Sequence, residues 1–95
     1  MDDGLNPYMS LLHVGWEWGL SNRVLGRALD EADYRTPLGT PSAKAVAEGL
    51  AIQRPNSSYG WHRDLVGDFI QQRGLSRRSE PMRKQMFMTE LIEFR

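Results

Sequence analysis

Hydrophobic residues recur every three or four positions along most of the chain, which is the spacing of amphipathic helices. The clearest stripe runs from Val24 to Ala32, where arginines and carboxylates occupy the opposite face. Similar stripes cover residues 43–51, 59–74 and 81–94, and Gly74 is suited to end the third of them. The pattern predicts an all-α protein, a compact bundle of four or five short helices.

The first stripe supports two interpretations. Asn6 followed by Pro7 favours a helix start, because Asn caps helices and proline fits their first position. A row at i+4 spacing also predicts that this helix continues into the next one: Leu12, Trp16, Leu20 and Val24. Residues 12–18 alternate as well, which is a strand pattern. A small β-hairpin involving 12–18, with the short alternation at Tyr59 and Trp61 as its partner, is therefore the alternative.

Length and composition narrow the class of protein. The chain has 95 residues, 12 acidic and 12 basic residues, and no cysteine. We expect one domain, residues 1–95, because smaller pieces would not stabilise themselves. Without cysteine there are no disulfides, thiolate zinc sites or thiol catalysis, and a cytoplasmic location fits. An acidic start and the lack of an apolar run of roughly 20 residues predict neither an export signal nor a membrane span.

The residues that could carry catalysis or bind a metal do not form a recognisable site. His13 and Glu17 are four positions apart and can share a helix face, but two ligands do not complete a metal site. Residues 39–44 contain a helix start and a lysine without the glycines of a phosphate-binding loop. No strand–turn–helix pattern presents a serine nucleophile. We therefore expect no enzyme activity, no catalytic residue, no metal and no cofactor.

A basic segment lies late in the chain, over residues 73–84, and only Glu80 opposes it. It consists of Arg73, Arg77, Arg78, Arg83 and Lys84. Gly74-Leu75-Ser76 resembles the turn of a helix-turn-helix DNA reader, but the resemblance ends at Glu80 and Pro81, where that motif needs an aliphatic residue and a regular helix. The segment could still bind nucleic-acid phosphates without sequence specificity, or an acidic protein surface.

Three tryptophans and a methionine-rich end provide a second candidate for binding. Methionine adapts to varied partners, and tryptophan is enriched among the residues that anchor interfaces. We expect Trp16 and Leu91 to fill the core, whereas Trp18, Trp61 and Met88 are harder to place there. An exposed apolar surface of this kind would form a homodimer or dock on another protein.

The sequence thus favours a non-enzymatic protein-binding module, a small regulator or inhibitor that occupies a surface on a larger protein or complex. Its expected contacts are apolar anchors with arginines at the rim: Trp18, Trp61, Phe87, Met88, Arg77, Arg78 and Arg83. The alternative is a nucleic-acid-binding protein, such as a transcription regulator, that uses Arg73, Arg77, Arg78, Arg83 and Lys84.

Overall fold

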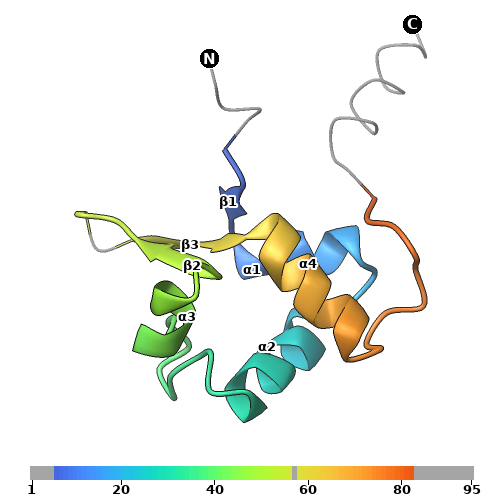
Figure 1. Ribbon diagram of the computed structural model, residues 1–95, viewed down its shortest axis with the longest axis horizontal. Coiled ribbons are helices and arrows are strands. Elements are labelled where there is room, and N and C mark those ends of the chain that lie inside the picture. The colour runs from blue at the N-terminus through green and yellow to red at the C-terminus, as the bar shows by residue number, and fades with distance from the viewer. Residues whose placement is uncertain (1–5, 57, 83–95) are drawn as a thin grey trace, which may run out of the picture.

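Four helices and a three-stranded antiparallel sheet make up residues 6–56 and 58–82, which are the residues that the computed structural model describes (Figure 1). The helices are α1 (Leu11–Glu17), α2 (Asn22–Glu31), α3 (Ala43–Ala47) and α4 (Arg63–Gln72). The strands are β1 (Tyr8–Met9), β2 (Ala51–Gln53) and β3 (Tyr59–His62). The fold is therefore α+β, and the prediction of an all-α bundle of four or five helices is wrong.

The sheet has the order β1-β3-β2, so the last strand lies in the centre. Trp61 in β3 is opposite Met9 on one side and Ala51 on the other. The alternation at Tyr59 and Trp61 does belong to a strand, but its partners are β1 and β2. Residues 12–17 are helical, so the alternative prediction of a hairpin involving 12–18 is also wrong.

The first two helices are separate, which contradicts the predicted continuity between them. α1 begins after Ser10, whose side chain accepts a hydrogen bond from the N–H of His13 at 3.1 Å, and not after Asn6. Gly19 has a φ of 72°, a backbone conformation that favours glycine and that no helix continues through. The side chain of Ser21 then caps α2.

The other predicted helices match the structure only in part, because their observed bounds differ from the predicted ranges. The stripe from Val24 to Ala32 is α2, as predicted. The stripe over 43–51 yields only the five residues of α3, and β2 follows it. The stripe over 59–74 begins as β3 and becomes helical at Arg63; its end at Gly74, where φ is 64°, is confirmed. Of the helix predicted near Pro81, only Pro81 and Met82 lie within the described residues.

The core lies between the sheet and the longer helices. Its largest fully buried apolar side chains come from α1, α2, α4 and β3: Val14, Leu25, Leu29, Trp61, Val66 and Ile70. Burying these groups is the main favourable contribution to folding, since each large apolar side chain removed from water stabilises by about 1.5–3 kcal/mol. Within the described ranges, no helix is long and apolar enough to cross a membrane.

Candidate nucleic-acid interface

α1 and α2 form a helix-turn-helix, with the four residues 18–21 as the turn between two helices in contact. Two glycines make this close approach possible. Gly19 supplies the positive φ of the turn. Gly15 lies so near to it that a Cβ there would be 2.8 Å from the carbonyl oxygen of Leu20, and the N–H of Leu20 donates to the carbonyl of Gly15 at 2.8 Å. A larger residue at position 15 would force the turn away from α1.

The first six residues of α2 present polar and positive groups to solvent. Leu25 and Leu29 anchor the helix in the core, while Asn22, Arg23 and Arg27 are exposed. The aligned peptide dipoles add a partial positive charge at the N-terminus of the helix. The exposed face of residues 22–27 is therefore suited to contact an anionic, hydrogen-bonding ligand.

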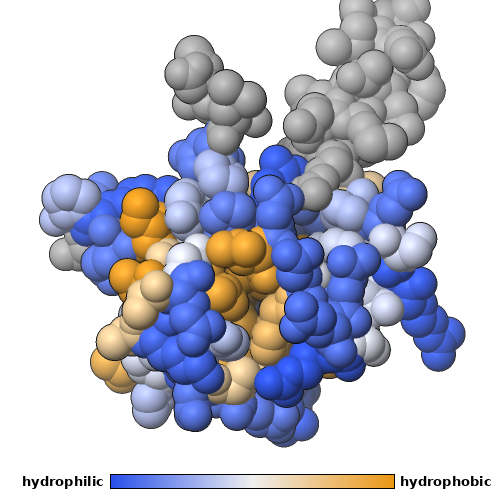
Figure 2. Space-filling view, in the orientation of Figure 1, coloured by the Kyte–Doolittle hydropathy of each residue, from blue (hydrophilic) through white to orange (hydrophobic). Residues whose placement is uncertain are grey.

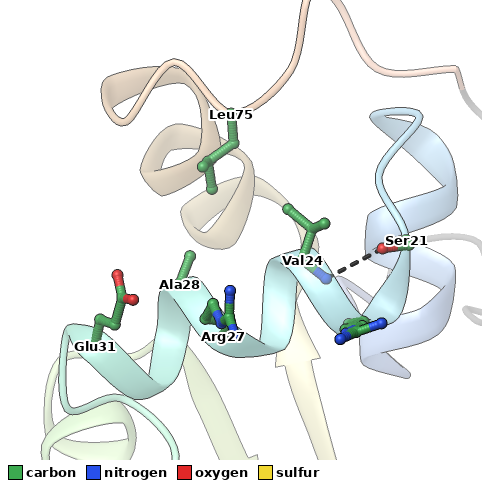
Figure 3. Close-up of a pocket in the computed structure, with 7 residues that line it drawn as sticks. Ser21, Val24, Arg27, Ala28, Glu31 and Leu75 are labelled. Carbon is green, nitrogen blue, oxygen red and sulfur yellow. Dashed lines mark hydrogen bonds between the residues drawn. The ribbon is translucent and has the colours of Figure 1, made fainter.

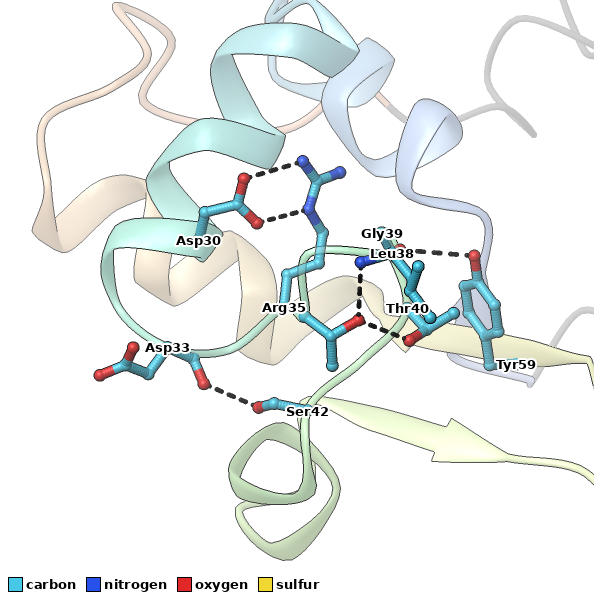
Figure 4. Close-up of polar contacts among 9 residues, drawn as sticks. Asp30, Asp33, Arg35, Leu38, Gly39, Thr40, Ser42 and Tyr59 are labelled. Atoms are coloured by element: carbon cyan, nitrogen blue, oxygen red, sulfur yellow. Dashed lines mark hydrogen bonds and ion pairs between the residues drawn. The ribbon is translucent and has the colours of Figure 1, made fainter.

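The second half of α2 carries the carboxylates of Asp30 and Glu31. Asp30 accepts two hydrogen bonds from Arg35, at 2.8 Å from Nε and 3.1 Å from Nη2 (Figure 4). These hydrogen bonds lower the pKa of Asp30 from its usual value. The charge on the exposed face thus changes from positive to negative along the helix, and Arg35 compensates one of the two negative groups.

The loop between α2 and α3 holds Arg35 in this position (Figure 4). The backbone of Arg35 pairs with that of Pro41 as an isolated antiparallel bridge. The hydroxyl groups of Thr36 and Thr40 hydrogen-bond to each other at 2.8 Å, which closes the loop beyond the bridge. The hydroxyl of Ser42 donates to the backbone carbonyl of Asp33, just after α2, and so connects the end of the loop back to its start. The bridge between Arg35 and Pro41 and the hydrogen bond of Ser42 therefore hold Arg35 next to α2.

A groove of about 480 Å³ runs along α2 beside the segment that follows α4. Figure 3 shows Leu75 of that segment pointing toward Ala28 of the helix. Apolar and charged groups alternate along the groove, whose lining consists of Ser21, Arg23, Val24, Arg27, Ala28, Glu31 and Leu75. Two arginines therefore border an apolar floor that solvent can reach.

The segment after α4 is attached to the turn of the helix-turn-helix. The hydroxyl of Ser76 donates to the carbonyl of Trp18 at 2.6 Å. The N–H of Met82 donates to the carbonyl of Glu17 at 2.7 Å. These two bonds bring the predicted basic segment, distant in sequence, to the end of α1 and the start of α2.

Comparison of the chain with protein-family models, with curated proteins and with solved structures found no match. The interpretation of this surface therefore depends on its geometry and on general principles of recognition.

The predicted nucleic-acid contacts that the structure describes are all exposed arginines: Arg73, Arg77 and Arg78. The Arg73 guanidinium lies over the ring of Phe69, 4.9 Å from its centre. The Arg78 guanidinium lies against Gly19, with Nε 2.8 Å from where a Cβ of that glycine would be. Other predicted contacts lie outside the described residues: Arg83, Lys84, Phe87 and Met88.

Trp18 and Trp61 are core residues. Their exposed fractions are 4% and 1%, whereas Trp16, which we expected in the core, is 42% exposed. Trp18 packs against α4, where its indole Nε1 is 3.1 Å from the position that a Cβ of Gly67 would take. The expectation that Trp18 and Trp61 are exposed anchors is wrong, because both side chains are already enclosed by the fold.

Glu17 forms a buried ion pair at the end of α1. Its carboxylate is fully buried and accepts a hydrogen bond from Nη2 of Arg63 at 2.6 Å. His13 and Glu17 do share a helix face, with Nε2 of His13 3.5 Å from the same oxygen. The arginine that pairs with this carboxylate, Arg63, belongs to α4, so the ion pair connects α1 with α4. No three potential metal ligands gather within residues 6–56 and 58–82.

The functional residues that the sequence interpretation missed are those of α2. Gly19-Leu20-Ser21 repeats the tripeptide Gly74-Leu75-Ser76, which we compared with a helix-turn-helix turn. The first copy ends in Ser21, which caps a ten-residue helix, whereas the described residues that follow the second copy, 77–82, are not helical. The tripeptide at 19–21 therefore did indicate a helix-turn-helix turn, although the i+4 row of apolar residues across it favoured one continuous helix.

Proposed function

We propose that the protein binds nucleic acid, as a binding protein and not an enzyme, through α2 and the arginines that border it. The observation that carries this proposal is the helix-turn-helix of α1 and α2. In nucleic-acid-binding proteins with such a motif, the second helix makes the principal contacts. In this chain the second helix exposes Asn22, Arg23 and Arg27 among its first six residues.

The distribution of charge supports the same function. The formal net charge of the chain is zero, but arginines from two segments lie at the groove and the turn: Arg23 and Arg27 line the groove, and Arg78, which follows Arg77 in the sequence, lies against Gly19 of the turn. Such a local positive surface attracts a polyanion irrespective of the net charge of the protein. The guanidinium group also forms two parallel hydrogen bonds to a phosphate, which favours arginine at such sites.

We expect the affinity for a mixed-sequence DNA duplex to fall steeply as salt rises from about 50 to 200 mM, because each arginine that contacts a phosphate releases counterions. Arg78→Ala, which removes the guanidinium that lies against the turn, should weaken binding and make the slope of log K against log salt shallower by about one. Fluorescence anisotropy with a labelled duplex measures both quantities.

The matched control is Arg54→Ala, which removes the same charge from the connection between β2 and β3 and not from the lining of the groove. It should leave the slope unchanged, provided that thermal melting shows both variants to be folded. Affinity that does not depend on salt, or equal effects of the two variants, would contradict the proposal.

A second candidate function, binding of another protein, is favoured by an apolar patch on a different face. Figure 2 shows apolar atoms gathered over α3, β2 and the start of α4. The large apolar side chains exposed on these elements are Val46, Ile52 and Leu65. A patch made of three elements is more typical of a partner-binding surface than single scattered residues are.

If this patch binds a protein, Ile52→Ser with Leu65→Ser should abolish the capture of that partner from a nuclease-treated lysate. Arg23→Ala with Arg27→Ala should leave the capture unchanged, since these arginines lie on α2. Mass spectrometry of the captured proteins measures the difference. Capture that survives the serine substitutions would exclude this patch as the binding surface.

A further inference from the structure

We infer that the nucleic acid is double-stranded DNA, that α2 enters its major groove with the N-terminal end deepest, and that Asn22, Arg23 and Arg27 read the bases. This inference rests on the proposed function and names its substrate class. It depends on three features of α2, namely its shape, the change of charge along it, and the residue types among its first six residues.

The shape and composition of α2 favour a duplex with an accessible major groove. Its ten residues span about 15 Å, and the major groove of B-form DNA, about 12 Å wide, admits a helix. In double-stranded RNA the corresponding groove is too deep and narrow for side chains to read. Single strands are bound mainly by stacking on exposed aromatic rings, and α2 contains no aromatic residue.

The change of charge along α2 determines which end approaches the DNA. Arg23 and Arg27 attract the phosphates on both sides of the groove, and the helix dipole adds to this attraction at the N-terminus. Asp30 and Glu31, at the C-terminal end, are repelled by the same phosphates. Arg35 compensates Asp30, so the remaining repulsion comes mainly from Glu31, which lines the groove of Figure 3. The helix therefore inclines so that its first half is deep and its last turn is outside.

The exposed asparagine and arginines among the first six residues of α2 have the hydrogen-bonding groups that suit purines. Arginine forms two hydrogen bonds with guanine, and asparagine forms two with adenine. Arg23 and Arg27 are four residues apart, about 6 Å along the helix, which corresponds to roughly two base pairs. Val24 lies between them and is 47% exposed, so its methyl groups are available to a thymine methyl. The expected target has two guanines about two base pairs apart, with an adenine beside them.

The experiment selects binding sites with the full chain from a library of randomised duplexes. Affinities are then measured for the selected duplex and for a scrambled duplex of the same composition. Arg27→Ala should weaken binding to the selected duplex by about tenfold to a hundredfold, and to the scrambled duplex much less. Arg77→Ala, which removes a charge outside α2, should weaken binding to both duplexes by the same factor.

Arg27→Lys separates base reading from charge, because lysine keeps the charge and lacks the planar pair of donors. It should retain affinity for the scrambled duplex and lose the preference for the selected one. Asn22→Ala should specifically remove the preference for adenine. Circular dichroism and thermal melting of every variant confirm that the fold is intact.

The outcomes distinguish this inference from the proposed function. Salt-dependent duplex binding with no selected sequence, or with equal effects of Arg27→Ala and Arg77→Ala on both duplexes, would overturn base reading and leave nucleic-acid binding in place. Tighter binding to single strands or to RNA would overturn the duplex inference alone. Failure to bind any of these nucleic acids would overturn both.

Discussion

Trp18→Ala is expected to lower the free energy of unfolding by about 3–5 kcal/mol, which is the usual cost of truncating a buried aromatic side chain to alanine. The side chain is almost completely buried and fills the space between the turn of the helix-turn-helix and Gly67 of α4. Alanine would leave a cavity that the surrounding helices can only partly fill. Urea denaturation followed by circular dichroism measures the loss.

Trp16→Ala is the matched control, since it makes the same chemical change two residues earlier, at an exposed position in α1. Substitutions on the surface usually change stability by about 0.5 kcal/mol or less, and the partial burial of Trp16 adds modestly to this. A loss for Trp16→Ala as large as that for Trp18→Ala would contradict the placement of these two side chains.

Glu17→Gln is the second substitution with a large expected effect, again a loss of about 3–5 kcal/mol. Glutamine has nearly the same shape as glutamate but no charge, so the largely buried guanidinium of Arg63 would lose its ion pair. An uncompensated buried charge is far more costly than an intact pair is stabilising. The midpoint of thermal unfolding should fall by more than about 10 °C in a domain of this size.

Two further variants test the cause of that loss. Glu31→Gln removes the same charge from an exposed position and should leave stability nearly unchanged. Glu17→Met combined with Arg63→Met removes both charges together and should recover most of the stability, because neither charge remains buried alone. No recovery in the double variant would mean that Glu17 acts through something other than its charge.

The position of α2 was predictable because the helix is long enough to display its full period. Its ten residues place Leu25 and Leu29 on one face and arginines on the other, so both the helix and its buried side follow from the pattern. Gly74 was predictable for a local reason as well, since the backbone at the end of α4 requires a positive φ. Both features depend on interactions between near neighbours in sequence.

The sheet was not predictable because its strands have only two to four residues. Such strands offer one or two inward positions each, too few for a period of two to be distinguished from a helical period. Trp61 is fully buried in a strand that β1 and β2 flank, and the pairing with β1 connects Trp61 to Met9, 52 positions earlier in the sequence. Tertiary contacts of this kind override the local preference.

The candidate site was predictable only in part, for the same reason. The arginines after α4 were evident as a cluster, but their proximity to α2 depends on the bond between Ser76 and Trp18, which are 58 positions apart. The row Leu12, Trp16, Leu20 and Val24 suggested one helix, although its first two members are exposed on α1 and Val24 is exposed on α2. A regular apolar row therefore indicates helical conformation without indicating which side is buried.

The bond between the N–H of Met82 and the carbonyl of Glu17 also offers a site for a fluorescent reporter. Because the chain contains no cysteine, Met82→Cys would create the only thiol for attaching a dye. The dye would sit next to the turn that precedes α2, while the backbone bond that fixes the position would be retained. Its emission would respond to a ligand that arrives at the helix-turn-helix, whatever the chemical nature of that ligand.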